Sequence, residues 1–137
     1  MYYKLLLIAL LFGVYGCSNT TKTNTATTAA NQVVDSGKQL RHVVLFKFKD
    51  SAAQANILKV EDAFNALPAK IQEIKGYEWG LNNSPEGLNK GFTHCYFLTF
   101  NSAKDRDTYL VHPDHVAFGQ VLSPYLDDVL VVDYWNE

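Results

Sequence analysis

Cysteine and basic charge are both scarce in this sequence of 137 residues. Two cysteines, Cys17 and Cys95, allow at most one disulfide. Lys and Arg number 12 against 14 Asp and Glu, and the formal net charge of -2 argues against a nucleic-acid partner. The sequence also has no Gly-rich phosphate loop, no nucleophile-elbow motif and no paired-cysteine redox motif. Nucleotide-binding, hydrolase and thioredoxin-like functions therefore have no support.

The amino-terminal apolar run is too short for a membrane-spanning helix. Leu5 to Phe12 is apolar throughout but falls far short of the roughly 20 residues that such a helix needs. Because the run follows Lys4 and precedes Gly16 and Cys17, it is typical of a secretory signal. We therefore expect the chain to be exported.

Residues 14–17, Val-Tyr-Gly-Cys, resemble the lipobox of bacterial lipoproteins, although Tyr15 replaces the usual small residue. The resemblance implies cleavage before Cys17 and lipid on that cysteine, and several acyl chains give stable anchoring. We expect residues 1–16 to be a lipoprotein signal peptide and the chain to be anchored to a membrane of the bacterial cell envelope. Ordinary signal cleavage nearby is the alternative.

The segment after Cys17 has the composition of a tether. Residues 18–38 are dominated by Thr, Asn, Ala and Ser and contain no aromatic residue, so they bury too little apolar surface to offset chain entropy. We expect residues 17–38 to be a lipidated cysteine and a flexible spacer, and residues 39–137 to be one folded domain. If Cys17 is lipidated, Cys95 is left without a disulfide partner, and we expect it to be buried packing.

Hydrophobic periodicity divides the folded domain into strands and helices. Asp50 or Ser51 is expected to cap the first helix, and Asn101 or Ser102 the second. The expected order is β-α-β-β-α-β with the last helix broken at Pro113, which is the ferredoxin-like arrangement of the α+β class. The expected strands are 42–48, 77–81, 93–100 and 129–135, and the expected helices are 57–71, 102–110 and 113–122.

The strands are apolar on both faces, which predicts that both faces are covered. Val43 and Leu45 lie opposite Val44 and Phe46 in the first strand, and the last strand has the same pattern. Helices in this fold cover one face and leave the other bare. A twofold homodimer joined sheet to sheet is the simplest way to cover the second face.

Three segments together resemble the stress-responsive A/B barrel (Dabb) family: residues 41–49 (RHVVLFKFK), 91–94 (GFTH) and 109–118 (YLVHPDHVAF). The resemblance spans nearly the whole folded part. Known members form dimers in which two four-stranded sheets make a barrel with the helices outside. The same dimeric α/β barrel is therefore expected here.

The resemblance also implies a site. A plant polyketide cyclase of this family closes a linear polyketide without a cofactor, and its essential His and Tyr correspond to His115 and Tyr109. Its other cavity histidines resemble His42 and His94, which implies that these two bind ligand in the same pocket. The ligand-contacting set that we predict also includes two aromatic residues, Phe46 and Trp79. No cofactor and no metal are expected.

The chemistry of this pair is that of an aldol closure. A histidine titrates near neutral pH and can take the proton beside a carbonyl group, and the amino-terminal end of the helix that Pro113 opens favours a neutral His115. The hydroxyl of Tyr109 can donate a hydrogen bond to the carbonyl oxygen that gains charge. The leading hypothesis is a lipid-anchored protein that binds a small oxygenated or aromatic ligand and performs proton-transfer chemistry of the cyclase or lyase type.

Structural roles compete with these assignments. His112 is expected to cap the helix after it, and His42 and His94 can be satisfied interior histidines. Tyr109 alone would be interpreted as core. A noncatalytic envelope stress-response or ligand-binding dimer is therefore the alternative function. A metal site built from His42, His94, His112 and His115 is a third hypothesis, which the absence of a recognised ligand pattern disfavours.

Overall fold

The computed structural model describes residues 37–137. The expected signal peptide, Cys17 and nearly all of the expected tether lie outside these residues and stay predictions. Within the described part, no helix combines the length and the apolarity that crossing a membrane requires.

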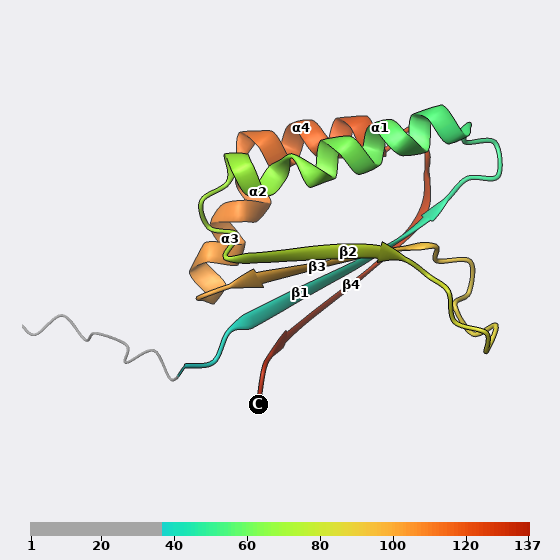
Figure 1. The fold of residues 1–137 in the computed structure, drawn as a ribbon. Helices are drawn as coiled ribbons and strands as arrows, with labels where there is room; N and C mark the ends of the chain where they lie inside the picture. The colour runs from blue at the N-terminus through green and yellow to red at the C-terminus, as the bar shows by residue number, and fades with distance from the viewer. Residues whose placement is uncertain (1–36) are drawn as a thin grey trace, which may run out of the picture. The chain divides into compact units, whose positions relative to one another are not determined.

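Four antiparallel strands form one sheet within residues 37–137 (Figure 1). The order across the sheet is β2-β3-β1-β4, so β2 and β4 are its edges. The strands are β1 (Leu40–Phe48), β2 (Gly76–Leu81), β3 (His94–Phe100) and β4 (Leu126–Trp135).

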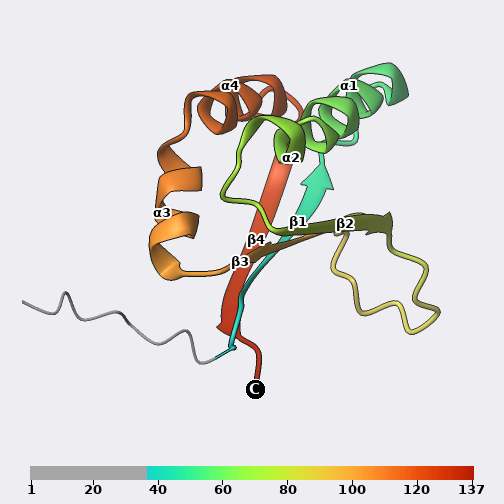
Figure 2. The ribbon, with the colours of Figure 1, turned by 60° about the vertical axis from the view of Figure 1, so that its left-hand side comes forward.

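The helices of the described part gather on one side of this sheet, as Figures 1 and 2 show from two directions. They are α1 (Gln54–Asn65), α2 (Leu67–Lys70), α3 (Ala103–Val111) and α4 (Pro113–Leu122). The predicted ferredoxin-like α+β fold is confirmed, with the first helix divided near Pro68 and the last broken before Pro113. We call the sheet face away from the helices the open face.

The core lies between the sheet and α1. Phe64 from α1 packs its ring 4.1 Å from Tyr96 of β3 and 5.9 Å from Phe46 of β1, measured between ring centroids. Within the expected helix 57–71, apolar residues recur every three or four positions, at Ile57, Val60, Phe64, Leu67 and Ile71. All of them are buried except Ile57, which is half-buried. The 3.6-residue spacing therefore identified the buried face of this helix.

Side-chain caps were predicted correctly for the last two helices and wrongly for the first. The hydroxyl of Ser102 accepts a hydrogen bond from the backbone N–H of Asp105, and His112 caps α4 in the same way. The predicted cap at Asp50 or Ser51 is wrong, because α1 begins at Gln54 after Ala53, whose side chain makes no capping bond. Residues 49–52 form a turn before the helix, in which the N–H of Ala52 donates to the carbonyl of Lys49. Asp50 and Ser51 therefore belong to this turn and not to the start of α1.

Candidate functional site

A pocket of about 300 Å³ lies between β1, β4 and the paired helices α3 and α4. His42, Tyr109, His115 and Asp133 supply its titratable side chains. The rest of its wall is largely apolar, and comprises Val44, Phe46, Phe64, Leu110, Phe118, Gly119, Leu122, Val129 and Val131. A small ligand with one polar end fits such a lining.

Tyr109 lies in α3 and is fully buried beside His115. The centroids of the two rings are 4.3 Å apart, and the ring of His42 lies 5.7 Å from that of Tyr109. Burial raises the pKa of the Tyr109 phenol far above its ordinary value. The hydroxyl therefore stays protonated and can act as a hydrogen-bond donor.

His115 is the third residue of α4, as its sequence position predicted. Its Nδ1 lies 3.1 Å from the carbonyl oxygen of Leu110. A carbonyl oxygen can only accept, so Nδ1–H donates and the lone pair of the neutral ring is on Nε2. The pKa of His115 is lowered, mainly by burial. The hydrogen bond to Leu110 raises the pKa, and the nearby His42 and His112 lower it further. The ring is thus a neutral base near pH 7.

His42 projects from β1 into the same pocket and is held by β4. Its Nδ1 donates to Oδ1 of Asp133 at 2.6 Å, and the guanidinium of Arg106 donates to the other carboxylate oxygen at 2.5 Å. The carboxylate accepts both bonds, so Nε2 of His42 carries the lone pair when the ring is neutral. This chain of contacts joins β1, β4 and α3.

Sequence reasoning missed Asp133 and Arg106. Asp133 could have been noticed because it is a charged residue in an otherwise apolar series. Val129 and Val131 alternate onto the helix side of β4, and Asp133 is the next residue on that side. A carboxylate at such a position needs a partner. Which partner it has depends on strand pairing, which aligns Asp133 with His42.

Replacing Asp133 with asparagine is expected to remove a pH-dependent part of the stability. Burial raises the pKa of this carboxyl, but the hydrogen bonds and charges of His42 and Arg106 outweigh burial and hold the pKa below its ordinary value. A carboxyl group whose pKa is lower in the folded state stabilises the fold at pH values above its ordinary pKa of about 4. This stabilisation is lost as the pH falls through the lower, folded-state pKa. Asp133→Asn should therefore be less stable than wild type at pH 7.

Urea unfolding at a series of pH values checks this expectation. The difference between Asp133→Asn and wild type should shrink as the pH falls below about 4. Asp62→Asn, on the exposed side of α1, is the matched control and should follow wild type throughout. A constant difference at all pH values would contradict the linkage.

The structure does not bring His94 into the pocket that His42 lines. His94 pairs with Phe46 across the sheet while His42 pairs with Leu98, so the two histidines are four rows apart, or about 13 Å along the strand. The ring of His94 instead bonds to Glu61 at 2.9 Å and to Thr93 at 2.8 Å. Alternation placed both histidines on one face correctly, but it carries no information on how far a pocket extends.

The other predicted residues divide between this pocket and other places. Phe46 lines the pocket, whereas Trp79 lies on β2 at the opposite edge of the sheet, stacked with His94 at 6.4 Å. Cys95 is half-buried on the open face, which corrects the expectation of full burial, because no helix within residues 37–137 covers that face. Its pKa is raised, mainly by burial and also by Glu78.

The four histidines of the metal hypothesis do not converge. Within residues 37–137, no three His, Cys, Asp or Glu side chains gather as a metal site requires. His112 has a different use, since its Nδ1 accepts a hydrogen bond from the N–H of Asp114 at 3.2 Å and so caps α4 as predicted.

Fold and pocket together define a ferredoxin-like α+β domain with a tyrosine and two histidines between its sheet and its helices. The sequence model of the Stress responsive A/B Barrel Domain (Dabb) family matches residues 40–136. The chain belongs to this family.

Two curated relatives illustrate the range of the family. Stress-response A/B barrel domain-containing protein HS1 of Arabidopsis thaliana is 36% identical over 95 residues, covering 69% of this chain and 87% of the relative. Olivetolic acid cyclase of Cannabis sativa is 30% identical over 95 residues, covering 69% of this chain and 94% of the cyclase. The family therefore includes a named enzyme.

Solved structures with the same fold include a second enzyme and a described dimer. Hydroxynitrile lyase from Passiflora edulis superposes with a TM-score of 0.68 at 27% identity, covering 72% of this chain and 94% of the lyase. A dimeric protein of unknown function from Bacteroides fragilis has a TM-score of 0.59 at 34% identity, covering 70% of this chain and 94% of that chain.

Proposed function

We propose that this chain is a lipid-anchored envelope protein whose pocket binds a small oxygenated or aromatic ligand and transfers a proton without a cofactor. The observation that carries the proposal is the pairing of Tyr109 and His115, with ring centroids 4.3 Å apart in the pocket that His42 also lines. The lipobox-like residues 14–17 support the anchor.

The proposed chemistry assigns one task to each side chain. Nε2 of His115 takes a proton from the carbon beside a carbonyl group, because its neighbour Nδ1 is occupied by the carbonyl of Leu110. The hydroxyl of Tyr109 donates to the carbonyl oxygen, where the electron pair of the broken C–H bond ends as an enolate. His42, oriented by Asp133, binds a second polar group of the ligand.

The named enzymes of similar sequence and fold support this class of chemistry. One is called a cyclase and the other a hydroxynitrile lyase, and both names describe bond-making or bond-breaking at carbon. The largely apolar wall of the pocket supports an aromatic or aliphatic ligand body.

We further propose that the chain acts as a homodimer joined through the open face. The Bacteroides fragilis protein of similar fold is described as dimeric. On the open face, β4 leaves Leu130 and Val132 each 45% exposed, and a contiguous apolar surface of this kind marks an interaction site.

Exchange of the α-protons of acetophenone in deuterium oxide tests the proposed proton transfer. Acetophenone offers the aromatic ring, the carbonyl oxygen and the enolisable carbon that the pocket would hold. Tyr109→Phe should slow exchange by about 10²-fold to 10³-fold, the usual effect of removing one donor to a developing oxyanion. Proton NMR of the methyl signal measures the rate, and saturation-transfer NMR measures binding.

Three outcomes separate the hypotheses. Binding without any exchange above the solvent rate would support the noncatalytic ligand-binding dimer and reject the enzyme. Neither binding nor exchange would reject the pocket as a site for this ligand class. Retention of full exchange by Tyr109→Phe would remove Tyr109 from the mechanism.

A further inference from the structure

One position in the pocket wall of α4 has no side chain. Residues three or four positions apart lie on the same side of a helix. On α4 the members of one such stripe line the pocket, and they are His115, Phe118, Gly119 and Leu122. Among residues 37–137, Gly119 is the one glycine inside a helix. The stripe that faces the ligand space is therefore interrupted at residue 119.

No contact within the described residues explains a glycine at this position. Gly119 does not have a positive φ, and its carbonyl accepts the regular helical bond from the N–H of Ser123 at 3.0 Å. A Cβ built on Gly119 would meet nothing within 4 Å, so no neighbour packs against the bare backbone. Glycine is unfavourable inside a helix because it loses more conformational freedom on folding than any other residue. Alanine would fit the protein better.

The wall that β4 contributes to the same pocket is also uncovered. Val129 and Val131 lie on the helix side of this edge strand and line the pocket, yet they are 43% and 49% exposed. Protein side chains therefore leave the space beside them open. The bare backbone at Gly119 and the two valines border one apolar gap.

This gap lies one helical turn from the proposed base. Gly119 follows His115 by four residues, which is about 6 Å along a helix axis. A ligand whose enolisable carbon lies at His115 therefore reaches Gly119 with the group on the other side of its carbonyl. The pocket volume of about 300 Å³ is at the lower limit for ligand pockets, so this group is small. A flat ring suits the gap, because a ligand can approach the backbone of a glycine closely.

We infer that Gly119 is a specificity-determining residue, which leaves room for one aromatic ring bonded directly to the reacting carbonyl group. This inference rests on the proposed function and narrows its ligand class to small aryl ketones. The ring packs between the α4 backbone at Gly119 and the side chains of Val129 and Val131. The carbonyl oxygen accepts the hydrogen bond from Tyr109.

Gly119→Ala in the full chain tests this placement of the ring. The added methyl group takes space that the ring needs, so the dissociation constant of acetophenone should rise about tenfold, the usual effect of overfilling a packed site. Acetone has the carbonyl group and the enolisable carbon but no ring, and its exchange should slow far less. The ratio of the acetophenone rate to the acetone rate, measured far below saturation, should fall about tenfold. An equal fall of both rates would mean that the methyl group disturbs the reacting side chains, and would overturn the inference.

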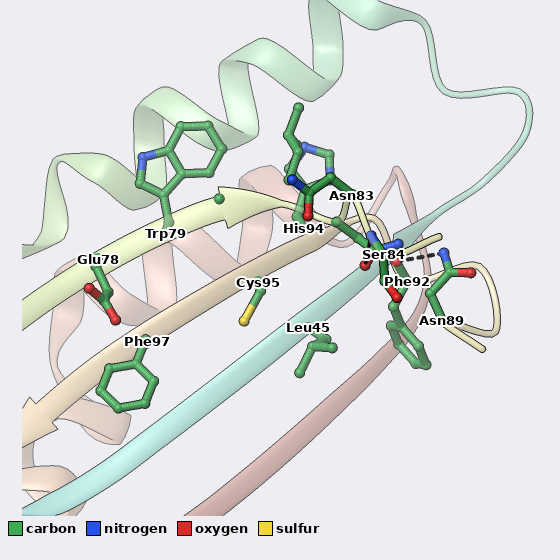
Figure 3. Close-up of a pocket in the computed structure, with 13 residues that line it drawn as sticks. Leu45, Glu78, Trp79, Asn83, Ser84, Asn89, Phe92, His94, Cys95 and Phe97 are labelled. Atoms are coloured by element: carbon green, nitrogen blue, oxygen red, sulfur yellow. Dashed lines mark hydrogen bonds between the residues drawn. The ribbon is translucent and has the colours of Figure 1, made fainter. Parts of the chain in front are cut away.

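A different cavity supplies the matched control. This cavity of about 570 Å³ lies beneath the β2–β3 loop, and Figure 3 shows Leu45, Cys95 and Phe97 along its floor. Gly80 lines it, and a Cβ built there would also meet nothing within 4 Å. Gly80→Ala therefore adds the same methyl group to another open space and should keep the wild-type rate ratio. Weaker acetophenone binding in Gly80→Ala but not in Gly119→Ala would place the ring beneath the loop instead.

Thermal unfolding provides a readout that needs no ligand. Gly119→Ala should raise the Tm by about 2–8 °C, because alanine is favoured over glycine inside a helix and the methyl group meets no neighbour. Ala117→Gly, on the exposed side of the same helix, should lower the Tm and bind acetophenone as wild type does. A lower Tm in Gly119→Ala would show that packing requires the glycine, and the inference would fail.

Toluene separates this inference from the proposed function. Toluene carries the ring without a carbonyl group, and dry apolar cavities bind such molecules. If wild type neither binds acetophenone nor exchanges its protons, the proposed function fails, and toluene alone decides whether the ring site exists. Binding by wild type and Gly80→Ala, with about tenfold weaker binding by Gly119→Ala, supports the ring site. Toluene that does not bind wild type, or that binds Gly119→Ala equally well, overturns it.

Discussion

Replacing His115 with alanine is expected to slow acetophenone α-proton exchange by about 10²-fold to 10⁴-fold, the usual contribution of a positioned general base. The neutral ring lies beside Tyr109 with Nδ1 occupied by the carbonyl of Leu110, so its other nitrogen is the base. Acetophenone should still bind, because the apolar wall remains. The exchange rate and the binding of the variant are measured by the NMR experiments described above.

The pH dependence of the exchange rate tests independently whether His115 is the base. Burial lowers the pKa of His115 below its ordinary value near 6.5. The wild-type exchange rate should therefore rise with pH to a plateau, with the midpoint of the rise below the ordinary histidine pKa of about 6.5. His112→Asn is the matched control, since asparagine also caps helices. It should keep the wild-type plateau rate, with the rise at slightly higher pH because His112 contributes to the lowered pKa of His115. An unchanged profile in His115→Ala would assign the base elsewhere.

The second large effect is expected from Phe64→Ala, which should lower the free energy of unfolding by about 3–5 kcal/mol. Phe64 is 1% exposed, and its ring contacts Tyr96 at 4.1 Å and Phe118 at 4.7 Å between centroids. It joins α1 to the sheet and to α4. Alanine leaves a cavity that these aromatic neighbours cannot refill without leaving their own contacts.

Urea unfolding at a fixed chain concentration measures this loss, because an associating protein changes stability with concentration. Leu58→Ala, on the same helix but 48% exposed, is the control and should change stability by less than about 0.5 kcal/mol. A loss below about 1 kcal/mol in Phe64→Ala would mean that the helix layer contributes little to the core.

The elements of the fold could be predicted from local patterns. Alternation in β1 identified the buried series that begins with His42 and Val44, and Pro113 marked the break between α3 and α4. These signals are strong because residue spacing directly decides which face a side chain occupies. The cap of α1 could not be predicted this way, since a turn at residues 49–52 competes for the same polar side chains.

Site residues could be predicted only where they lie close together in the sequence or where the family resemblance implied them. Tyr109 and His115 are six positions apart, and their pairing follows from two helices joined at His112. The bond between His42 and Asp133 joins residues 91 positions apart, and a single sequence does not specify which strands pair. The misplacement of His94 has the same origin, because its distance from His42 depends on the register in which β1 pairs with β3.

The break between α3 and α4 has a consequence for the order in which the site assembles. Tyr109 and His115 meet as soon as one short stretch folds around His112 and Pro113, so closing that loop costs little chain entropy. His42 and Asp133 come from the first and last strands of the domain and can meet only after synthesis of the final strand. Local contacts around His112 therefore form one half of the site, and the pairing of β4 with β1 brings in the other half.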